Sequence, residues 1–243
     1  MGDIDPATKA IVKQVFAYLG LVFWSFQLCP QAWSNYRHGA VGVLSSPMMF
    51  CWAIWAPFFA GYGMGKPEGR FTVGLIVQPN LFCFFALVCF VQCLLYRRQA
   101  RVITTQRATV LLALLCVVFG CLEFGMYLIV NWVGIQNPES GVLSALGLVP
   151  TVLIIGGFIP QYITICAQRQ VDGISFLFLA CDILGGIFSL VSLYFHDGPF
   201  DYISAGSYLG VIMLDLGIVV LHHWFVRHPS RSSRKTASLD DTL

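Results

Sequence analysis

The stretch IPQYITICAQRQVDGISFLFLACDILGGIFSLVSLYF, residues 159–195, contains two apolar runs separated by the short polar segment AQRQVDG. A helix needs about 20 mostly apolar residues to cross the hydrocarbon core of a bilayer. The whole chain of 243 residues has the same character, being 57% hydrophobic and 11% charged, whereas a soluble domain carries about 25% charged residues. This composition excludes a water-soluble fold, nucleic-acid binding and a secreted disulfide scaffold. It predicts a polytopic helical membrane protein.

The hydropathy pattern predicts seven membrane-spanning helices in an all-α protein. The apolar segments are continuous rather than alternating, which disfavours a β-barrel, and Lys13 is the one Lys or Arg that falls within them. The predicted spans are Ile11–Leu28, Val43–Met64, Phe71–Tyr96, Ala108–Val130, Val142–Ile165, Ile174–Phe195 and Ile203–Val226.

The basic residues are distributed unequally between the two sides of this arrangement. Ten of the fourteen Lys and Arg residues fall on the side of the C-terminal tail, and cytosolic connections carry an excess of these residues. We therefore expect the N-terminal tail, residues 1–10, outside the cell or in an organelle lumen. The C-terminal tail, residues 227–243, is expected to be cytosolic and disordered.

A related stretch, LCPQAWSNYRHGAVGVLSSPMMFCWAIWAP at residues 28–57, lies 130 residues before the first. At this offset the two Pro-Gln dipeptides coincide, and four further pairs match. These pairs are Val41 and Val171, Leu44 and Ile174, Ser45 and Ser175, and Cys51 and Cys181. The pattern predicts two parallel three-helix repeats, residues 11–106 and 142–226, joined by a linker helix at 107–133. Internal repeats with a binding site between them are a recurring transporter plan.

The prolines of the two dipeptides have a mechanical interpretation. Proline removes a backbone hydrogen bond and kinks a helix, and irregular backbone at membrane depth is tolerated where it lines a cavity. We expect Pro30 and Pro160 to act as hinges, with Gln31 and Gln161 satisfying the carbonyls that the prolines leave unpaired. The segment Gln78-Pro79-Asn80 predicts a further break facing a central site, with a simple packing kink as the alternative.

Three carboxyl groups fall within the predicted spans, on Glu123, Asp182 and Asp215. Burying an ionised carboxylate in hydrocarbon costs at least ~2.5–3.5 kcal/mol on insertion scales, and no Lys or Arg lies at comparable depth to pair with them. Desolvation favours the protonated form of such a group, so the three residues are candidate proton carriers. The alternative is a protonated acid that makes a structural hydrogen bond between helices.

Helical spacing collects candidate pocket residues around the two aspartates. At about 1.5 Å of rise per residue, both aspartates lie near the middle of the membrane. Asp182 shares a small, polar helix face with Gly185, Gly186 and Ser189, and Asp215 shares a stripe with Ser204, Tyr208 and Val211. Ser189 and Tyr208, together with Gln78 and Asn80, form the predicted substrate pocket. For the glycines, close helix packing is the alternative.

The remaining chemistry-bearing residues predict no catalytic or metal site. Nine cysteines fall in spans or at their edges without a C-x-x-C pair, which favours packing. Trp24, Trp33, Trp132 and Trp224 lie toward span ends, as an interfacial aromatic belt requires. No nucleophile–base–acid arrangement, phosphate loop or zinc spacing is present in the sequence. We therefore predict no enzyme activity, no cofactor and no metal.

The second repeat resembles the PQ-loop repeat proteins, a family that includes cystinosin and the vacuolar and lysosomal basic-amino-acid exporters and is related to the SWEET sugar carriers. The resemblance rests on Pro160-Gln161, Gly173-Ile174-Ser175, Asp182 followed by Gly185-Gly186, and Asp215 in the last span. The first repeat departs after its loop, where Trp52 and Ala56-Pro57 replace the Gly-Asp pair of the amino-acid exporters. The overall character is that of uncharacterised fungal PQ-loop proteins.

The resemblance implies a secondary transporter that exports a small polar solute, such as cystine or a basic amino acid, from a vacuole or lysosome by proton-coupled alternating access. Its expected partners are this solute, protons and the lipid bilayer, and no nucleic acid. Two alternatives stay open. One is a non-transporting seven-helix sensor or cargo receptor, and the other is a SWEET-like sugar uniporter. The plasma membrane is the alternative location.

Overall fold

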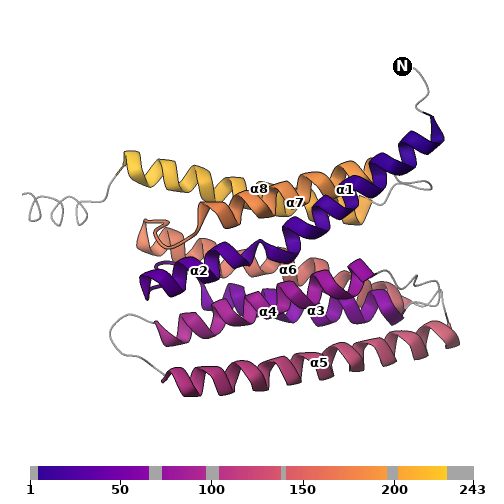
Figure 1. The fold of residues 1–243 in the computed structure, drawn as a ribbon, viewed down its shortest axis with the longest axis horizontal. Coiled ribbons are helices and arrows are strands. Elements are labelled where there is room, and N and C mark those ends of the chain that lie inside the picture. The colour runs from indigo at the N-terminus through magenta and orange to yellow at the C-terminus, as the bar shows by residue number, and fades with distance from the viewer. Residues whose placement is uncertain (1–4, 66–72, 97–103, 138–140, 196–201, 229–243) are drawn as a thin grey trace, which may run out of the picture.

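The computed structural model describes residues 5–65, 73–96, 104–137, 141–195 and 202–228. These residues form eight α-helices and no strand, so the predicted all-α membrane class is confirmed (Figure 1). The helices are α1 (Pro6–Phe26), α2 (Leu28–His38), α3 (Ser46–Gly65), α4 (Val73–Leu95), α5 (Thr105–Gln136), α6 (Gly141–Gln168), α7 (Phe176–Tyr194) and α8 (Tyr202–Arg227).

Six stretches of helix are long and apolar enough to cross a membrane, and they correspond to six of the seven predicted spans. They are Pro6–His38, Val77–Leu95, Thr105–Gln136, Ala145–Gln168, Phe176–Tyr194 and Ala205–Arg227. The predicted second span coincides with α3, which packs against α4, α5 and α6. Because α3 is enclosed by other helices, much of its surface meets protein rather than lipid. Its Trp, Tyr, Gly and Pro residues are compatible with such surroundings.

The first span is longer than predicted at both ends. Its start is capped by Asp5, whose carboxylate accepts a hydrogen bond from the Thr8 backbone N–H at 3.2 Å, and side-chain caps of this kind stabilise a helix start. The predicted end at Leu28 is wrong. Helical backbone resumes after Gln27 and continues to His38, followed by Gly39 at φ +58°. Pro30 therefore lies in the first turn of α2 rather than at the end of a span.

The two repeats are interleaved rather than side by side. In Figure 1, α1 lies with α7 and α8 on one side of the molecule, α3, α4 and α5 lie on the other, and α6 lies between them. The most extensive contacts between the halves are those of α1 with α7 and of α3 with α6. The first helix of each repeat thus packs against the second helix of the other repeat. Any cavity between these four helices is shared by both halves.

The backbone reproduces the 130-residue offset that the sequence predicts. Residues 31–50 and 161–180 have the same succession of helix, turn and helix. In both copies a serine, Ser45 or Ser175, precedes the second helix, and its hydroxyl accepts a hydrogen bond from the backbone N–H three residues further on, at 3.4 and 3.3 Å. The loops are thus built on the same local hydrogen bonds.

Candidate functional site

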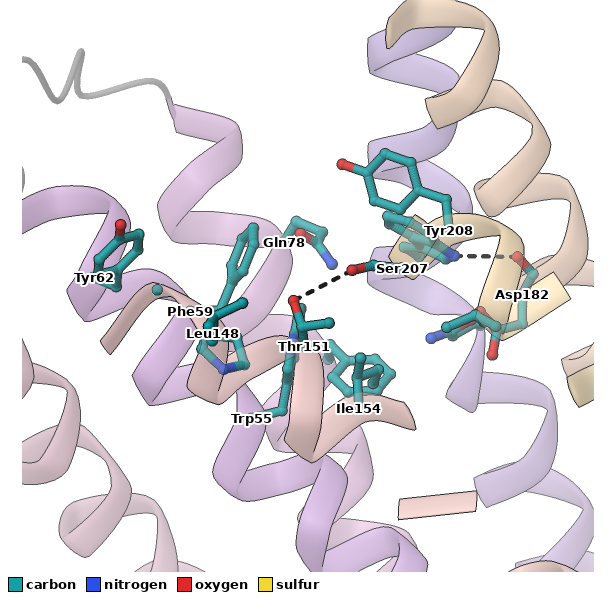
Figure 2. Close-up of a pocket in the computed structure, with 16 residues that line it drawn as sticks. Trp55, Phe59, Tyr62, Gln78, Leu148, Thr151, Ile154, Asp182, Ser207 and Tyr208 are labelled. Carbon is teal, nitrogen blue, oxygen red and sulfur yellow. Dashed lines mark hydrogen bonds between the residues drawn. The ribbon is translucent and has the colours of Figure 1, made fainter. Parts of the chain in front are cut away.

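A cavity of about 420 Å³ lies between helices of both halves (Figure 2). Its aromatic wall consists of Trp24, Trp55, Phe59, Tyr62, Phe82 and Tyr208. Its polar lining consists of Gln27, Gln78, Thr151, Asp182 and Ser207. The Thr151 and Ser207 hydroxyls lie 3.2 Å apart across the cavity wall. A volume of this size is typical of small-molecule sites.

The positions of the lining residues show the direction in which the cavity extends. Tyr62 lies near the last residue of α3, whereas Leu148 and Ser207 lie near the first turns of α6 and α8. The cavity therefore reaches toward the membrane side on which α3 ends and α6 and α8 begin. The opposite side is formed by the two loops at residues 39–45 and 169–175, which we call the loop end.

Asp182 is buried in the wall of this cavity, on α7, with 2% of its surface exposed. Its backbone oxygen accepts a hydrogen bond from the Trp24 indole N–H at 3.1 Å. A Cβ on Gly185, one turn further along α7, would collide with the Trp24 ring. The absence of a side chain at Gly185 thus makes room for the indole. The expectation that Trp24 belongs to an interfacial belt is wrong, because its ring faces α7 and Tyr208.

Asp215 is the direct neighbour of Asp182 across the contact between α7 and α8. It is fully buried, and the side-chain hydrogen bond open to it among the described residues is the one with Asp182, which requires a proton on one of the two acids. Two adjacent carboxylates repel each other when both are ionised. The pair is therefore suited to holding one proton between two groups, of which only Asp182 lines the cavity.

The third predicted acid lies elsewhere. Glu123 on α5 is half-buried and accepts a hydrogen bond from the Asn80 side-chain amide at 3.1 Å. Both residues line a separate cavity of about 220 Å³ between α3, α4 and α5. The structure thus brings Asp182 and Asp215 together and leaves Glu123 apart from them.

The four predicted pocket residues divide in the same way. Gln78 and Tyr208 line the main cavity, whereas Asn80 lies with Glu123 in the smaller one. Ser189 packs against α1, where a Cβ on Gly20 would come within 2.6 Å of its hydroxyl oxygen. Helical spacing therefore did not separate cavity-facing from packing positions.

The two glutamines of the Pro-Gln dipeptides bind the loop of the opposite repeat. Gln31 accepts a hydrogen bond from the Ser175 backbone N–H at 2.6 Å, and its amide donates to the Gly173 carbonyl at 2.7 Å. Gln161 accepts from the Ser45 backbone N–H at 2.7 Å and donates to the Val43 carbonyl at 3.0 Å. Both glutamines are completely buried. We call these two reciprocal pairs the amide latches.

The amide latches replace the role predicted for the glutamines. Each side chain satisfies backbone groups of the other repeat, so the expectation that Gln31 and Gln161 bind the carbonyls freed by their own prolines is wrong. Pro160 lies within the continuous helix α6, where its carbonyl accepts a hydrogen bond from the Thr164 hydroxyl at 2.8 Å. This bond is made to the proline's own carbonyl, whereas the carbonyl that the missing N–H of Pro160 leaves unpaired is that of Gly156, four residues earlier.

The loops meet at two glycines between the amide latches. Gly42 and Gly173 both have positive φ, at +54° and +89°. A Cβ on Gly42 would collide with the Asp172 carbonyl, and one on Gly173 would lie 2.6 Å from the Cα of Gly42. The Val43 backbone N–H also donates to the Asp172 carbonyl at 2.8 Å. Backbone from both repeats therefore closes the loop end.

Sequence reasoning missed Gln27 and most of the aromatic wall. Hydropathy and helical spacing do not tell which face of an apolar helix turns toward a cavity. The repeat offset carried a usable signal, because two pairs of cavity residues, Gln78 with Tyr208 and Trp24 with Ile154, lie 130 residues apart. Applying the offset to every cavity position would have drawn attention to the first repeat as well as the second.

The sequence matches the PQ loop repeat family over residues 13–60 and 142–202, which fall within the two predicted repeats. An uncharacterised protein of Schizosaccharomyces pombe is 32% identical over 213 residues, which cover 88% of this chain and 72% of the relative. An uncharacterised membrane protein of Saccharomyces cerevisiae is 29% identical, over 87% of this chain and 66% of the relative. Cystinosin of Drosophila melanogaster is 23% identical, over 96% of this chain and 68% of the relative. With its two matched repeats, its reciprocal glutamines and these relatives, the chain belongs to the PQ-loop repeat family.

Proposed function

We propose that this protein is a secondary transporter that moves a small polar solute through the central cavity by alternating access. Membership of the PQ-loop repeat family and the likeness to cystinosin support transport rather than catalysis. The observation that carries the proposal is the contrast between the two ends of one shared cavity. The cavity extends toward one side of the membrane, while the amide latches close the other.

Release of the amide latches is the proposed opening step. The four latch hydrogen bonds contribute about 0.5–1.5 kcal/mol each, an amount that differential binding of a solute to the two states can offset. Pro160 and Pro30 are the proposed hinges, because a helix bends most easily where a backbone hydrogen bond is missing. Opening at the loop end, with closure around Tyr62 and Ser207, would present the same cavity to the other side.

The Asp182–Asp215 pair is the proposed proton carrier. Asp182 exchanges protons with the cavity, while Asp215 lies behind it and holds the shared proton away from water. Following the excess of basic residues on the side of the C-terminal tail, the loop end is cytosolic and the cavity end luminal. A vacuole or lysosome would then load the pair from its acidic lumen, and the solute would leave for the cytosol together with the proton.

Reconstitution into liposomes tests this function. Amino acids, organic amines and sugars are supplied with and without a pH gradient, and uptake is measured. Accumulation of an amino acid or an amine driven by the gradient alone is the expected result. Sugar equilibration that ignores the gradient would indicate a uniporter, and solute binding without any flux would indicate a receptor. Tags at both termini with protease protection test the orientation, since tags on one side of the membrane would contradict seven spans.

A further inference from the structure

We propose that the cavity binds its solute as a small organic ammonium ion and contains no subsite for a carboxylate. This inference rests on the proposed transport function and narrows the solute class from small polar solutes in general to amines without a carboxylate. It follows from three features of the cavity: the acidic side chain of Asp182, the unpaired acceptor oxygen of Gln27 and the aromatic walls.

The described lining of the cavity offers an acidic group and no basic one. Among the described residues that line it, Asp182 is the one charged side chain, and none is Lys, Arg or His. A solute carboxylate entering this space would lose its hydration and face another carboxyl group, and burial of an unpaired charge is strongly unfavourable. An ammonium group would instead pair with Asp182 while the neighbouring Asp215 keeps the shared proton.

The cavity lining includes a residue with an unpaired hydrogen-bond acceptor. Gln27, at the break between α1 and α2, is 4% exposed, and its side-chain oxygen has no hydrogen-bond partner in the described part of the chain. Leaving a buried acceptor unpaired costs its full desolvation. A solute with N–H donors satisfies this oxygen, whereas a carboxylate adds a further acceptor. The orphan oxygen of Gln27 and the carboxyl of Asp182 therefore select the same kind of group.

The aromatic walls suit a cation of modest size. The rings of Trp24 and Tyr208 pack against each other with their centroids 5.1 Å apart, and the rings of Trp55 and Phe59 are stacked with a centroid distance of 4.8 Å. Aromatic faces attract ammonium groups electrostatically, most of all when water is excluded. The same rings offer apolar surface to the body of the solute. A primary amine with a compact apolar body fits all three features.

Binding to the purified full-length protein in nanodiscs tests the inference separately from transport. Three compounds share one skeleton: phenethylamine, phenylalanine and 3-phenylpropionate. Isothermal calorimetry is expected to give the amine at least about tenfold tighter binding than the amino acid, with the carboxylate weaker still. The N,N,N-trimethyl derivative of phenethylamine keeps the charge but has no N–H donor, and is expected to bind more weakly than the primary amine. n-Pentylamine is measured beside them as an amine without an aromatic ring.

Variants locate the site. Gln27→Met keeps the volume and removes the acceptor, so the ligand-free protein is expected to melt at a higher temperature while the amine binds about tenfold more weakly. Gln168→Met, on an exposed glutamine at the end of α6, is the matched control and should change neither quantity. Asp182→Asn should remove the preference for amine over 3-phenylpropionate. If Asp182→Asn does not fold, the compound series on the wild type and Gln27→Met decides.

The outcomes separate the inference from the proposed function. Equal or tighter binding of phenylalanine or 3-phenylpropionate overturns the inference and leaves transport standing. Failure of both amines to bind also overturns it, as does unchanged amine affinity in Gln27→Met. Tight amine binding without any flux in liposomes contradicts the transport function and supports the cavity's selectivity.

Discussion

The two repeats share a backbone, but they place different chemistry at equivalent positions. Asp182 of the second repeat corresponds to Trp52 of the first, and Trp24 corresponds to Ile154. In one interface the Trp24 indole donates to the backbone oxygen of Asp182, and in the other the Trp52 indole donates to that of Ile154, both at 3.1 Å. The same contact is thus made twice, with the indole supplied from opposite sides.

The features that both repeats share are structural, whereas the buried acid that differs between them is the chemical one. The serine caps and the amide latches occur in both repeats, and they build and close the molecule. The buried carboxyl at the cavity occurs in the second repeat alone, where Gly185 leaves room for the Trp24 indole. Duplication has therefore kept the closing device symmetric, while the acid belongs to one half.

The largest expected effect comes from the position at which the repeats differ most. Asp182→Asn resembles the protonated acid and cannot release a proton, so accumulation driven by a pH gradient should be lost in liposomes. Asp215→Asn should show a milder loss, because Asp182 can still take up and release a proton at the cavity. Glu123→Gln, in the separate cavity, is the control and should retain transport. Full accumulation by Asp182→Asn would assign the carrier role to another acid.

A second test breaks the closure at the loop end. Gly42→Ala places a methyl group against the Asp172 carbonyl of the other repeat, whereas a Cβ at Gly39 meets no atom within 4 Å. Both glycines have positive φ, so both variants carry backbone strain of roughly 1–2 kcal/mol. Gly42→Ala should lose further stability and most of its transport, measured by thermal melting and flux. Equal losses in the two variants would mean that the contact between the loops contributes nothing.

A third test compares the two prolines. Pro160 interrupts the continuous helix α6, whereas Pro30 lies in the first turn of α2, where a proline is easily accommodated. Pro160→Ala should slow the maximal transport rate several-fold with little change in solute affinity, and Pro30→Ala should slow it less. Rates from flux and affinities from calorimetry check this. Parallel losses of rate and affinity in Pro160→Ala would argue against a hinge.

The smallest expected effect concerns two adjacent glycines of α6. A Cβ on Gly157 would lie 2.7 Å from the Trp52 ring, whereas one on Gly156 meets no atom within 4 Å. Gly157→Ala should destabilise the protein by about 1–3 kcal/mol through overpacking. Gly156→Ala should be neutral or stabilising by up to about 1 kcal/mol, because alanine favours helix. Denaturation of both variants measures the difference, and equal stabilities would show that Trp52 can shift without cost.

The sequence predicted the helical membrane fold and the repeat because apolar length and the Pro-Gln spacing are local properties. It also placed Asp182 and Asp215 at the same depth, which the helical rise determines. It did not predict that Gln31 would reach Ser175, since this contact depends on how the two repeats interleave. The position of Trp24 beside Asp182 was hidden for the same reason. The sequence around a residue does not reveal whether that residue packs against the other repeat.

The amide latches have one chemical consequence that concerns the choice of residue. A peptide group presents one N–H and one C=O, and the side-chain amide of glutamine presents the same pair. Gln161 bonds the backbone of residues 43 and 45 with both groups. Its side chain thus pairs with the loop as the peptide group of a neighbouring strand would. Glutamate at this position would turn a second acceptor toward the Val43 carbonyl, and methionine would offer no donor. Deamidation of Gln161 would therefore remove its hydrogen bond to the Val43 carbonyl while leaving the shape of the side chain unchanged.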